Sequence, residues 1–170
     1  MSELPAIGTR DEQPYAAIAT AVTMDGFDVV ESLTDEVFSW LLRRGLVPSG
    51  PPFVRILTSD MEAELDIEVG LPVDEPITGD GRIIAGSIPE GAYVTLFYTA
   101  DDQDDHLQAN VALQTWAADR HLEWQKDGSS GAEVWGGRFE FFHAEESSEG
   151  NQIFELTYQI TDHSAATASD

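Results

Sequence analysis

Residues 135–143 read WGGRFEFFH and place one acidic residue, Glu140, among aromatic side chains. If this stretch is a strand, alternation puts Arg138, Glu140 and Phe142 on one face. A carboxylate beside aromatic rings at low dielectric constant attracts a desolvated cation, and the ring faces add cation–π attraction. Burial also makes a carboxyl group hold its proton more tightly, as a general acid or base requires. The sequence thus predicts that Glu140 binds a cationic ligand or moves a proton; the alternative is an ion pair with Arg138 on a solvated face.

Four further aromatic residues are candidates for the walls of a pocket around Glu140: Tyr98, Trp116, Phe142 and Tyr158. Tyr98 and Tyr158 fall in strands that we expect nearest the junction between the two halves of the chain. Trp116 falls outside the apolar arc of its predicted helix, so we expect it to contact a ligand or a second copy of the chain. Because aromatic residues most often build the core of a domain, packing alone is the competing interpretation.

A second acidic residue, Glu68, belongs to a stretch in which acidic and apolar residues alternate. Residues 64–69 read ELDIEV, and this period of two predicts a strand with one wet and one dry face. A solvated face explains these acids in so acidic a chain. We keep Glu68 alone as a further possible acid of the pocket.

No metal or cofactor is expected. The four histidines lack the spacing of metal ligands, and the chain has no cysteine to supply a thiolate. The acidic run at 101–105 lacks the glycine and the final glutamate of a calcium loop. Neither a phosphate loop nor a serine-nucleophile motif is present.

The chain has 170 residues, of which 32 are acidic and 8 are lysine or arginine, so its formal net charge is −24. This charge argues against direct contact with nucleic acid, which needs cationic groups, and against anionic membrane surfaces. No apolar stretch is long enough to cross a membrane and no secretory signal is visible, so we expect a cytoplasmic protein. The acidity leaves open a different role, as an acidic DNA mimic that inhibits a DNA-handling enzyme.

The elements that must position these residues occur twice in the same order. The first half predicts a strand at 15–24, a helix at 28–44 that ends before Gly45, and strands at 53–57 and 63–73. The second half predicts a strand at 92–99, a helix at 106–126, and strands at 132–144 and 152–161, preceded by a short strand at 83–87. The apolar arc of the second helix should comprise Leu107, Val111, Leu113, Ala117, Ala118, Leu122 and Trp124.

This order predicts an α+β fold of duplicated β-α-β-β modules with pseudo-two-fold symmetry, in which an antiparallel sheet is backed by two long helices. We expect one domain at residues 1–162, with pseudo-repeats at 15–73 and 83–161. The small, polar residues 163–170 should form a disordered tail.

Over residues 15–161 the sequence resembles the GyrI-like effector-binding family, a small-molecule domain also found fused to transcription regulators. The resemblance is carried by the order and spacing of short segments. They are LLRRGL at 41–46, PPF at 51–53, GLPV at 70–73, IPEGAY at 88–93, ALQTW at 112–116 and RFEFF at 138–142.

The resemblance implies a pocket where the two modules meet, in which a buried acid, here Glu140, and surrounding aromatic residues bind bulky cationic or aromatic compounds. Some members hydrolyse strained, cyclopropane-bearing toxins with that acid and aromatic hydroxyl groups. This sequence departs from the family pattern at three places. Residues 99–102 read TADD where a His- and Gly-containing turn is common, Phe142 supplies no hydroxyl where tyrosine is common, and the last strand lacks the usual proline.

We therefore expect a stand-alone small-molecule-binding protein, without a fused DNA-binding segment, that acts as a sensor or sequestering protein for a lipophilic or cationic ligand. It should be a monomer or a homodimer. The alternatives are a hydrolase that uses Glu140 with Tyr98 or Tyr158 as hydrogen-bond donor, and the acidic inhibitor of a DNA-handling enzyme.

Overall fold

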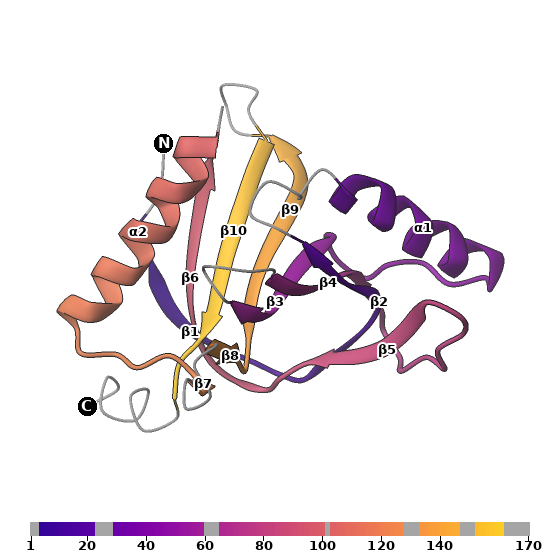
Figure 1. The fold of residues 1–170 in the computed structure, drawn as a ribbon, viewed down its shortest axis with the longest axis horizontal. Coiled ribbons are helices and arrows are strands. Elements are labelled where there is room, and N and C mark those ends of the chain that lie inside the picture. The colour runs from indigo at the N-terminus through magenta and orange to yellow at the C-terminus, as the bar shows by residue number, and fades with distance from the viewer. Residues whose placement is uncertain are drawn as a thin grey trace.

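The structure, a computed structural model, describes residues 4–22, 29–59, 65–100, 103–127, 133–146 and 152–161. Two β-α-β-β modules follow one another along the chain (Figure 1), as the sequence predicts. The first comprises β2 (Gln13–Val22), α1 (Val29–Arg43), β3 (Phe53–Ser59) and β4 (Leu65–Pro72). The second comprises β6 (Gly91–Thr99), α2 (Gln103–Asp119), β9 (Arg138–Glu146) and β10 (Gln152–Gln159).

Four further strands complete a ten-stranded antiparallel sheet: β1 (Ala6–Arg10), β5 (Ile83–Ile88), β7 (Lys126–Asp127) and β8 (Glu133–Trp135). The main strand order is β1-β6-β10-β9-β3-β4-β2-β5, and β8 joins β7 to β3. The strand β5, predicted at 83–87, pairs with β2 and so extends the sheet of the first module. The sequence did not indicate β1, a mostly exposed strand at the far edge.

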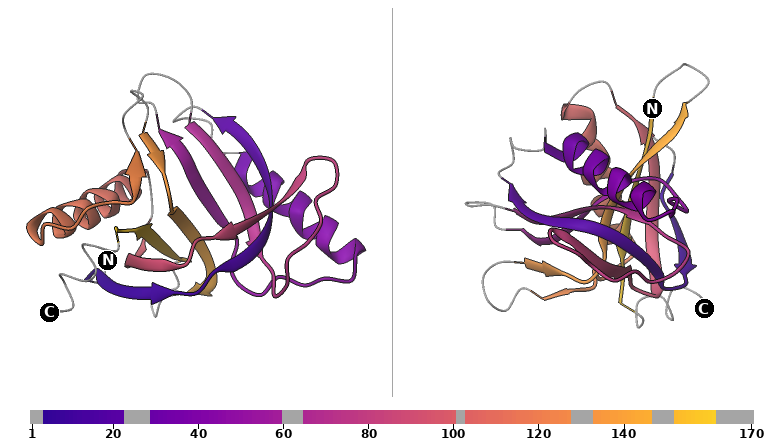
Figure 2. Two further views of the ribbon diagram at one scale, coloured as in Figure 1. Left: turned by 90° about the horizontal axis from the view of Figure 1, so that it is seen from below. Right: turned by 90° about the vertical axis from the view of Figure 1, so that its right-hand side faces the viewer.

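The sheet is curled, with α1 and α2 packed on the same face at opposite ends of the strand order (Figures 1 and 2). Two apolar clusters lie on this face, one beneath α1 and one beneath α2. A third cluster fills the opposite face and contains Tyr15 of β2 and Tyr93 of β6. Because these two strands are distant in the sheet order, the sheet must curl around this third cluster.

Both helices end in the same way. Beyond α1, the amide of Leu46 donates to the carbonyl of Leu41, and Gly45 has a φ of 72°. Beyond α2, the amide of Leu122 donates to the carbonyl of Ala117, and His121 has a φ of 58°. This is the Schellman arrangement, in which a left-handed residue lets the chain satisfy the last helical carbonyls. Gly45 was predicted to end its helix, whereas nothing in the sequence marked His121.

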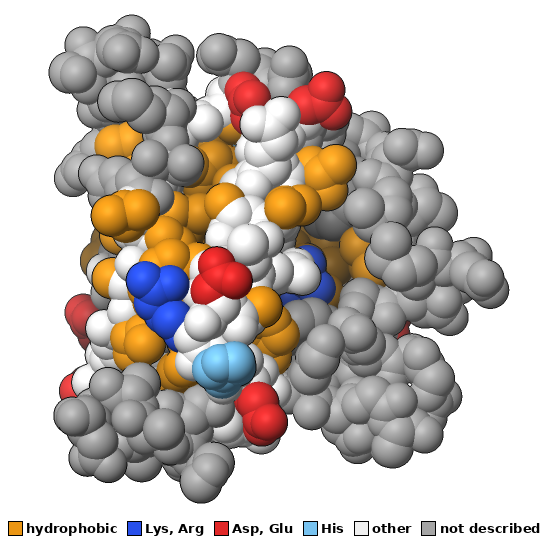
Figure 3. All heavy atoms as spheres, turned by 90° about the vertical axis from the view of Figure 1, so that its left-hand side faces the viewer, with side chains coloured by type: hydrophobic (Ala, Val, Ile, Leu, Met, Phe, Trp, Pro, Cys, Tyr) orange, Lys and Arg blue, Asp and Glu red, His pale blue; other side chains and the backbone are white. Residues whose placement is uncertain are grey.

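The second helix corrects two predictions. It ends at Asp119, not at residue 126, because His121 turns the chain away. Its inward face is also different: Leu113 and Ala117 are buried as predicted, but Leu107 and Val111 are 62% and 56% exposed. Helix α2 lies on the side of the molecule that Figure 3 shows, where hydrophobic side chains gather. Apolar residues occur all round this helix, so hydrophobicity alone did not identify the face that packs.

The predicted strand at 132–144 is two strands, β8 and β9, separated by Gly136 and Gly137. A Cβ on Gly136 would lie 2.7 Å from the side chain of Gln125, and a Cβ on Gly137 would lie 2.9 Å from the hydroxyl of Tyr93. Both contacts are closer than real Cβ atoms tolerate, so the interruption requires glycine.

No described helix is long and apolar enough to cross a membrane. Within the described ranges, no three His, Asp or Glu side chains lie close enough together to hold a metal ion. The predicted tail at 163–170 lies outside the described residues.

Candidate functional site

Glu140 lies where the two modules join. The joining strands are β3 of the first module and β9 of the second, and Glu140 is directly opposite Val54 in this pair. On the other side of β9, Glu140 is opposite Leu156 of β10. Val54 belongs to the cluster beneath α1 and Leu156 to the cluster beneath α2. The face that carries Glu140 is therefore the helix-covered face, at the boundary between the two clusters.

The carboxylate of Glu140 is held by two groups from the second module. The hydroxyl of Tyr98, near the end of β6, donates to Glu140 Oε1 at 3.0 Å. The same hydroxyl lies 2.9 Å from Nδ1 of His106, in the first turn of α2. Because a hydroxyl has one proton to donate, this second contact takes its proton from the imidazole. The Nδ1–H of His106 thus points at the tyrosine oxygen and lies 3.3 Å from Glu140 Oε1.

Three aromatic rings form a row beside this carboxylate. Phe154 on β10 is directly opposite Tyr98 on β6 and Phe142 on β9, so the three rings share one face in register. The rings of Tyr98 and Phe154 stack at 5.5 Å, and Phe142 meets Phe154 edge to face at 5.9 Å. The ring of His106 also meets that of Phe154 edge to face, with the ring centres 4.7 Å apart. We call Glu140, Tyr98, His106, Phe142 and Phe154 the Glu140 cluster.

The Glu140 cluster is neither open to bulk solvent nor sealed. The side chain of Glu140 is 23% exposed and that of His106 is 30% exposed. Glu140 therefore does not lie on a fully solvated face, and its ion pair with Arg138 stays the alternative prediction. A carboxylate in this position can be reached by a ligand while its hydrogen bonds and the neighbouring rings limit its hydration.

Burial raises the pKa of Tyr98 well above the ordinary tyrosine value, and the adjacent charge of Glu140 raises it further. Burial is also the main cause that raises the pKa of Tyr158. Both hydroxyl groups therefore keep their protons at neutral pH. Tyr98 presents its proton to Glu140, whereas Tyr158 donates to Oδ1 of Asn110 on α2.

The structure brings together three of the six predicted site residues, Glu140, Tyr98 and Phe142. Tyr98 reaches Glu140 although its strand is not next to the junction, since β10 and β9 lie between β6 and β3; our expectation for the placement of that strand was wrong. Tyr158, on β10, is 2% exposed and packs in the core beneath α2, edge to face with Trp124.

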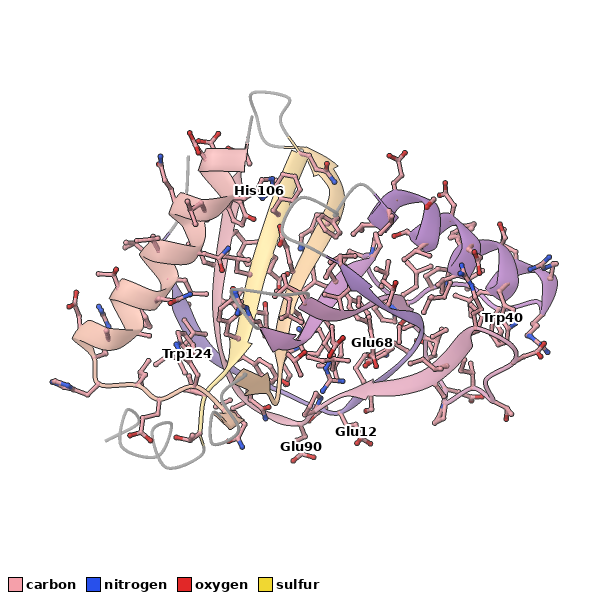
Figure 4. All side chains as sticks on the ribbon, viewed as in Figure 1. Glu12, Trp40, Glu68, Glu90, His106 and Trp124 are labelled. Atoms are coloured by element: carbon pink, nitrogen blue, oxygen red, sulfur yellow. The ribbon has the colours of Figure 1, made fainter. Side chains whose placement is uncertain are left out.

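Trp116 and Glu68 lie apart from the Glu140 cluster. Trp116 is ten residues beyond His106 on α2, a rise of about 15 Å, and its ring is covered by the guanidinium of Arg120 at 3.9 Å. Glu68 lies on the opposite face of the sheet, where it accepts a hydrogen bond from Tyr15. Figure 4 shows the separation of Glu68 from His106. The role of all six residues as ligand contacts stays a prediction.

Two members of the Glu140 cluster were missed. His106 was considered, with the other histidines, only as a metal ligand, and Phe154 was not among the aromatic residues chosen as pocket walls. Strand register brings Phe154 to Glu140, and the position of the first turn of α2 brings His106 there; no local sequence pattern indicates either.

No model of a known protein family matches the sequence, and no curated protein matches it. Solved structures do. The EcmrR C-terminal domain, a GyrI-like fold, superposes with a TM-score of 0.71 at 14% identity, over 93% of this chain and 97% of that one. A hydrolase from Listeria innocua has a TM-score of 0.63 at 12% identity, over 93% and 92%. SAV2435 bound to tetraphenylphosphonium has a TM-score of 0.60 at 7% identity, over 99% and 100%. The chain therefore has the fold of GyrI-like domains.

Proposed function

We propose that the chain is a small-molecule-binding protein that holds bulky aromatic or cationic ligands at the Glu140 cluster, as a sensor or a sequestering protein. The observation that carries this proposal is the position of one partly exposed carboxylate at the module junction, fixed by Tyr98 and His106 and bordered by a row of aromatic rings. The tetraphenylphosphonium bound by the structural neighbour SAV2435 has the chemistry that this arrangement would attract.

Electrostatics favour a cation over an anion of the same shape. A cation about 4 Å from a carboxylate gains about 4 kcal/mol at an effective dielectric constant of about 20, and about 1 kcal/mol in bulk water. Contact with an aromatic face adds about 0.5–2 kcal/mol. The hydrogen bond from Tyr98 orients the carboxylate of Glu140 without covering it, since part of the side chain remains exposed.

The test compares two probes of one shape and opposite charge, tetraphenylphosphonium and tetraphenylborate, by thermal shift at high ionic strength. High salt suppresses the general attraction of cations to a chain of net charge −24. The proposal expects stabilisation by the phosphonium alone. Stabilisation by both probes to the same extent would show that apolar contact, and not charge, drives binding. Stabilisation by neither probe would refute the proposed binding of such ligands at the Glu140 cluster.

A hydrolase is the second candidate, and the proton arrangement around Glu140 is the observation that favours it. Glu140 could act as the general base toward a water molecule, and Tyr98, which keeps its proton, could turn its hydroxyl from Glu140 to donate to a strained or electrophilic ligand. Of the two tyrosines considered as donors, Tyr98 fits better, because Tyr158 donates to Asn110 in the core. A hydrolysed product detected by mass spectrometry and lost in Glu140→Gln would establish this function; binding without product would dismiss it.

The role as acidic inhibitor of a DNA-handling enzyme stays a prediction from composition. It requires salt-sensitive binding to a basic protein that does not depend on Glu140.

A further inference from the structure

A cavity of about 290 Å³ opens on the other face of the sheet from Glu140. Alternation along β9 turns Phe141 and His143 away from the helices and into this cavity. Glu155 of β10, Arg10 at the end of β1 and Gln13 at the start of β2 complete its polar lining. A turn that contains Pro51 and the end of β4 close the cavity on its remaining side. Taking about 30 Å³ for each water-sized group, the space suits a molecule of about ten non-hydrogen atoms.

The cationic group of the cavity is Arg10, one of 8 lysine or arginine residues in the chain. Its guanidinium lies over the ring of Phe141, at 5.0 Å from the ring centre. Among the described residues, no carboxylate forms an ion pair with it. A guanidinium presents a fork of N–H donors, and such a fork suits the two oxygens of a carboxylate.

The anionic group of the cavity is Glu155, whose side chain is 13% exposed. It accepts a hydrogen bond from Nε2 of His143 at 2.8 Å and another from the hydroxyl of Thr157. Because Thr157 points its single hydroxyl proton at Glu155, the hydrogen bond of 3.3 Å between Thr157 and Thr95 is donated by Thr95. This chain of hydrogen bonds holds the carboxylate at the wall of the cavity.

We propose that this cavity is a second binding site and that its ligand is a small zwitterion, with an anionic group on Arg10 and a cationic group on Glu155. A ligand with only a negative charge would be repelled by Glu155 and by the field of a chain with net charge −24. A ligand with only a positive charge would be repelled by Arg10. A molecule that carries both charges satisfies both walls, and Phe141, Pro51 and Pro72 provide apolar contact for its carbon chain. The site is independent of the Glu140 cluster because the two lie on opposite faces of the sheet.

The test uses two matched sets of probes in amide-detected NMR titrations of the full chain. One set is γ-aminobutyrate, butyrate and butylammonium; the other is ε-aminocaproate, caproate and hexylammonium. We expect at least one zwitterion to shift the amides of Phe141, His143 and Glu155 and to bind about tenfold more tightly than its two singly charged partners. If no zwitterion in either set binds more tightly than both partners, the proposal is overturned.

Matched variants locate the binding. Arg10→Gln and Glu155→Gln should each weaken the zwitterion about tenfold or more. Arg82→Gln and Glu36→Gln remove the same charges from an exposed ion pair and should leave its affinity unchanged. The spectra themselves report folding; if Glu155→Gln does not fold, Arg10→Gln carries the test. Equal affinity in Arg10→Gln and the parent protein would refute the site.

Discussion

All four tyrosines of the chain are buried: Tyr15, Tyr93, Tyr98 and Tyr158 are 1–3% exposed. Burial raises the pKa of every one of these hydroxyl groups, and it raises that of Tyr93 to about 12. For Tyr98 and Tyr15, an adjacent carboxylate raises the pKa further. The protein should therefore resist the formation of tyrosinate until it unfolds.

The perturbation is a rise in pH through the ordinary tyrosine pKa of about 10. Above this pH the unfolded chain releases four protons that the folded protein keeps. The contribution of these tyrosines to the free energy of unfolding is therefore fully present below pH 10 and is lost as the pH rises. Each tyrosine contributes a slope of about 1.4 kcal/mol per pH unit, and four contribute about 5 kcal/mol per unit until about pH 12. Since domains are typically stable by about 5–15 kcal/mol, unfolding should follow within about one to three units.

The assay follows tyrosinate absorbance and far-ultraviolet circular dichroism in one alkaline titration. Both signals should change together, in a single cooperative step above pH 10. In Tyr98→Phe, the absorbance step should lose a quarter of its amplitude. Tyrosinate that appears with a midpoint near 10, while the circular dichroism stays native, would refute the burial of these hydroxyl groups; if Tyr98→Phe abolishes that early signal, the buried hydroxyl at Glu140 is refuted.

Gly45→Ala should lower the free energy of unfolding by about 1 kcal/mol, because Gly45 has a φ of 72°, which alanine adopts only with strain. An added Cβ would touch nothing within 4 Å, so this backbone strain is the whole cost. An unchanged urea midpoint would contradict the left-handed conformation of Gly45. Leu113→Ala should lower the free energy of unfolding by about 2–5 kcal/mol, whereas Leu107→Ala should change it by less than about 0.5 kcal/mol. Equal losses in the two variants would contradict the assignment of Leu113 to the inward face of α2. Phe154→Leu should weaken tetraphenylphosphonium about threefold to tenfold in calorimetry by removing the central ring; the same affinity in both proteins would exclude Phe154 from the site.

Much of the fold could be predicted because its elements carry strong periodic patterns. Helix α1 has its apolar residues on one face and a glycine at its end, and β4 alternates acidic with apolar residues. The inward face of α2 could not be found in this way. There the helix presents Ala109 and Ala117, whose small side chains let it pack closely, while the larger Leu107 and Val111 face outward.

The site was predictable only as far as local alternation reaches. The alternation of β9 placed Glu140 and Phe142 on one face, and the resemblance to GyrI-like domains implied that Glu140 lies where the modules meet; both expectations agree with the observed register. Strand alternation showed that Glu68 faces away from its apolar neighbours, but it could not show which face of the sheet the helices cover. That depends on how the whole sheet curls and packs, which no local pattern records. His106 and Phe154 needed the pairing of β6 with β10, which depends on long-range contacts.

The most direct measurement of the central claim is the affinity of tetraphenylphosphonium for Glu140→Gln and for Glu36→Gln, by titration calorimetry at high ionic strength. Both variants remove one negative charge, but Glu36 lies in an exposed ion pair with Arg82, away from the module junction. The account predicts a loss of about tenfold or more in Glu140→Gln and parent-like affinity in Glu36→Gln. Equal affinity in the two variants would contradict a role for the carboxylate at the junction: an equal loss would assign the attraction to net charge, and parent-like affinity in both would assign it to other contacts.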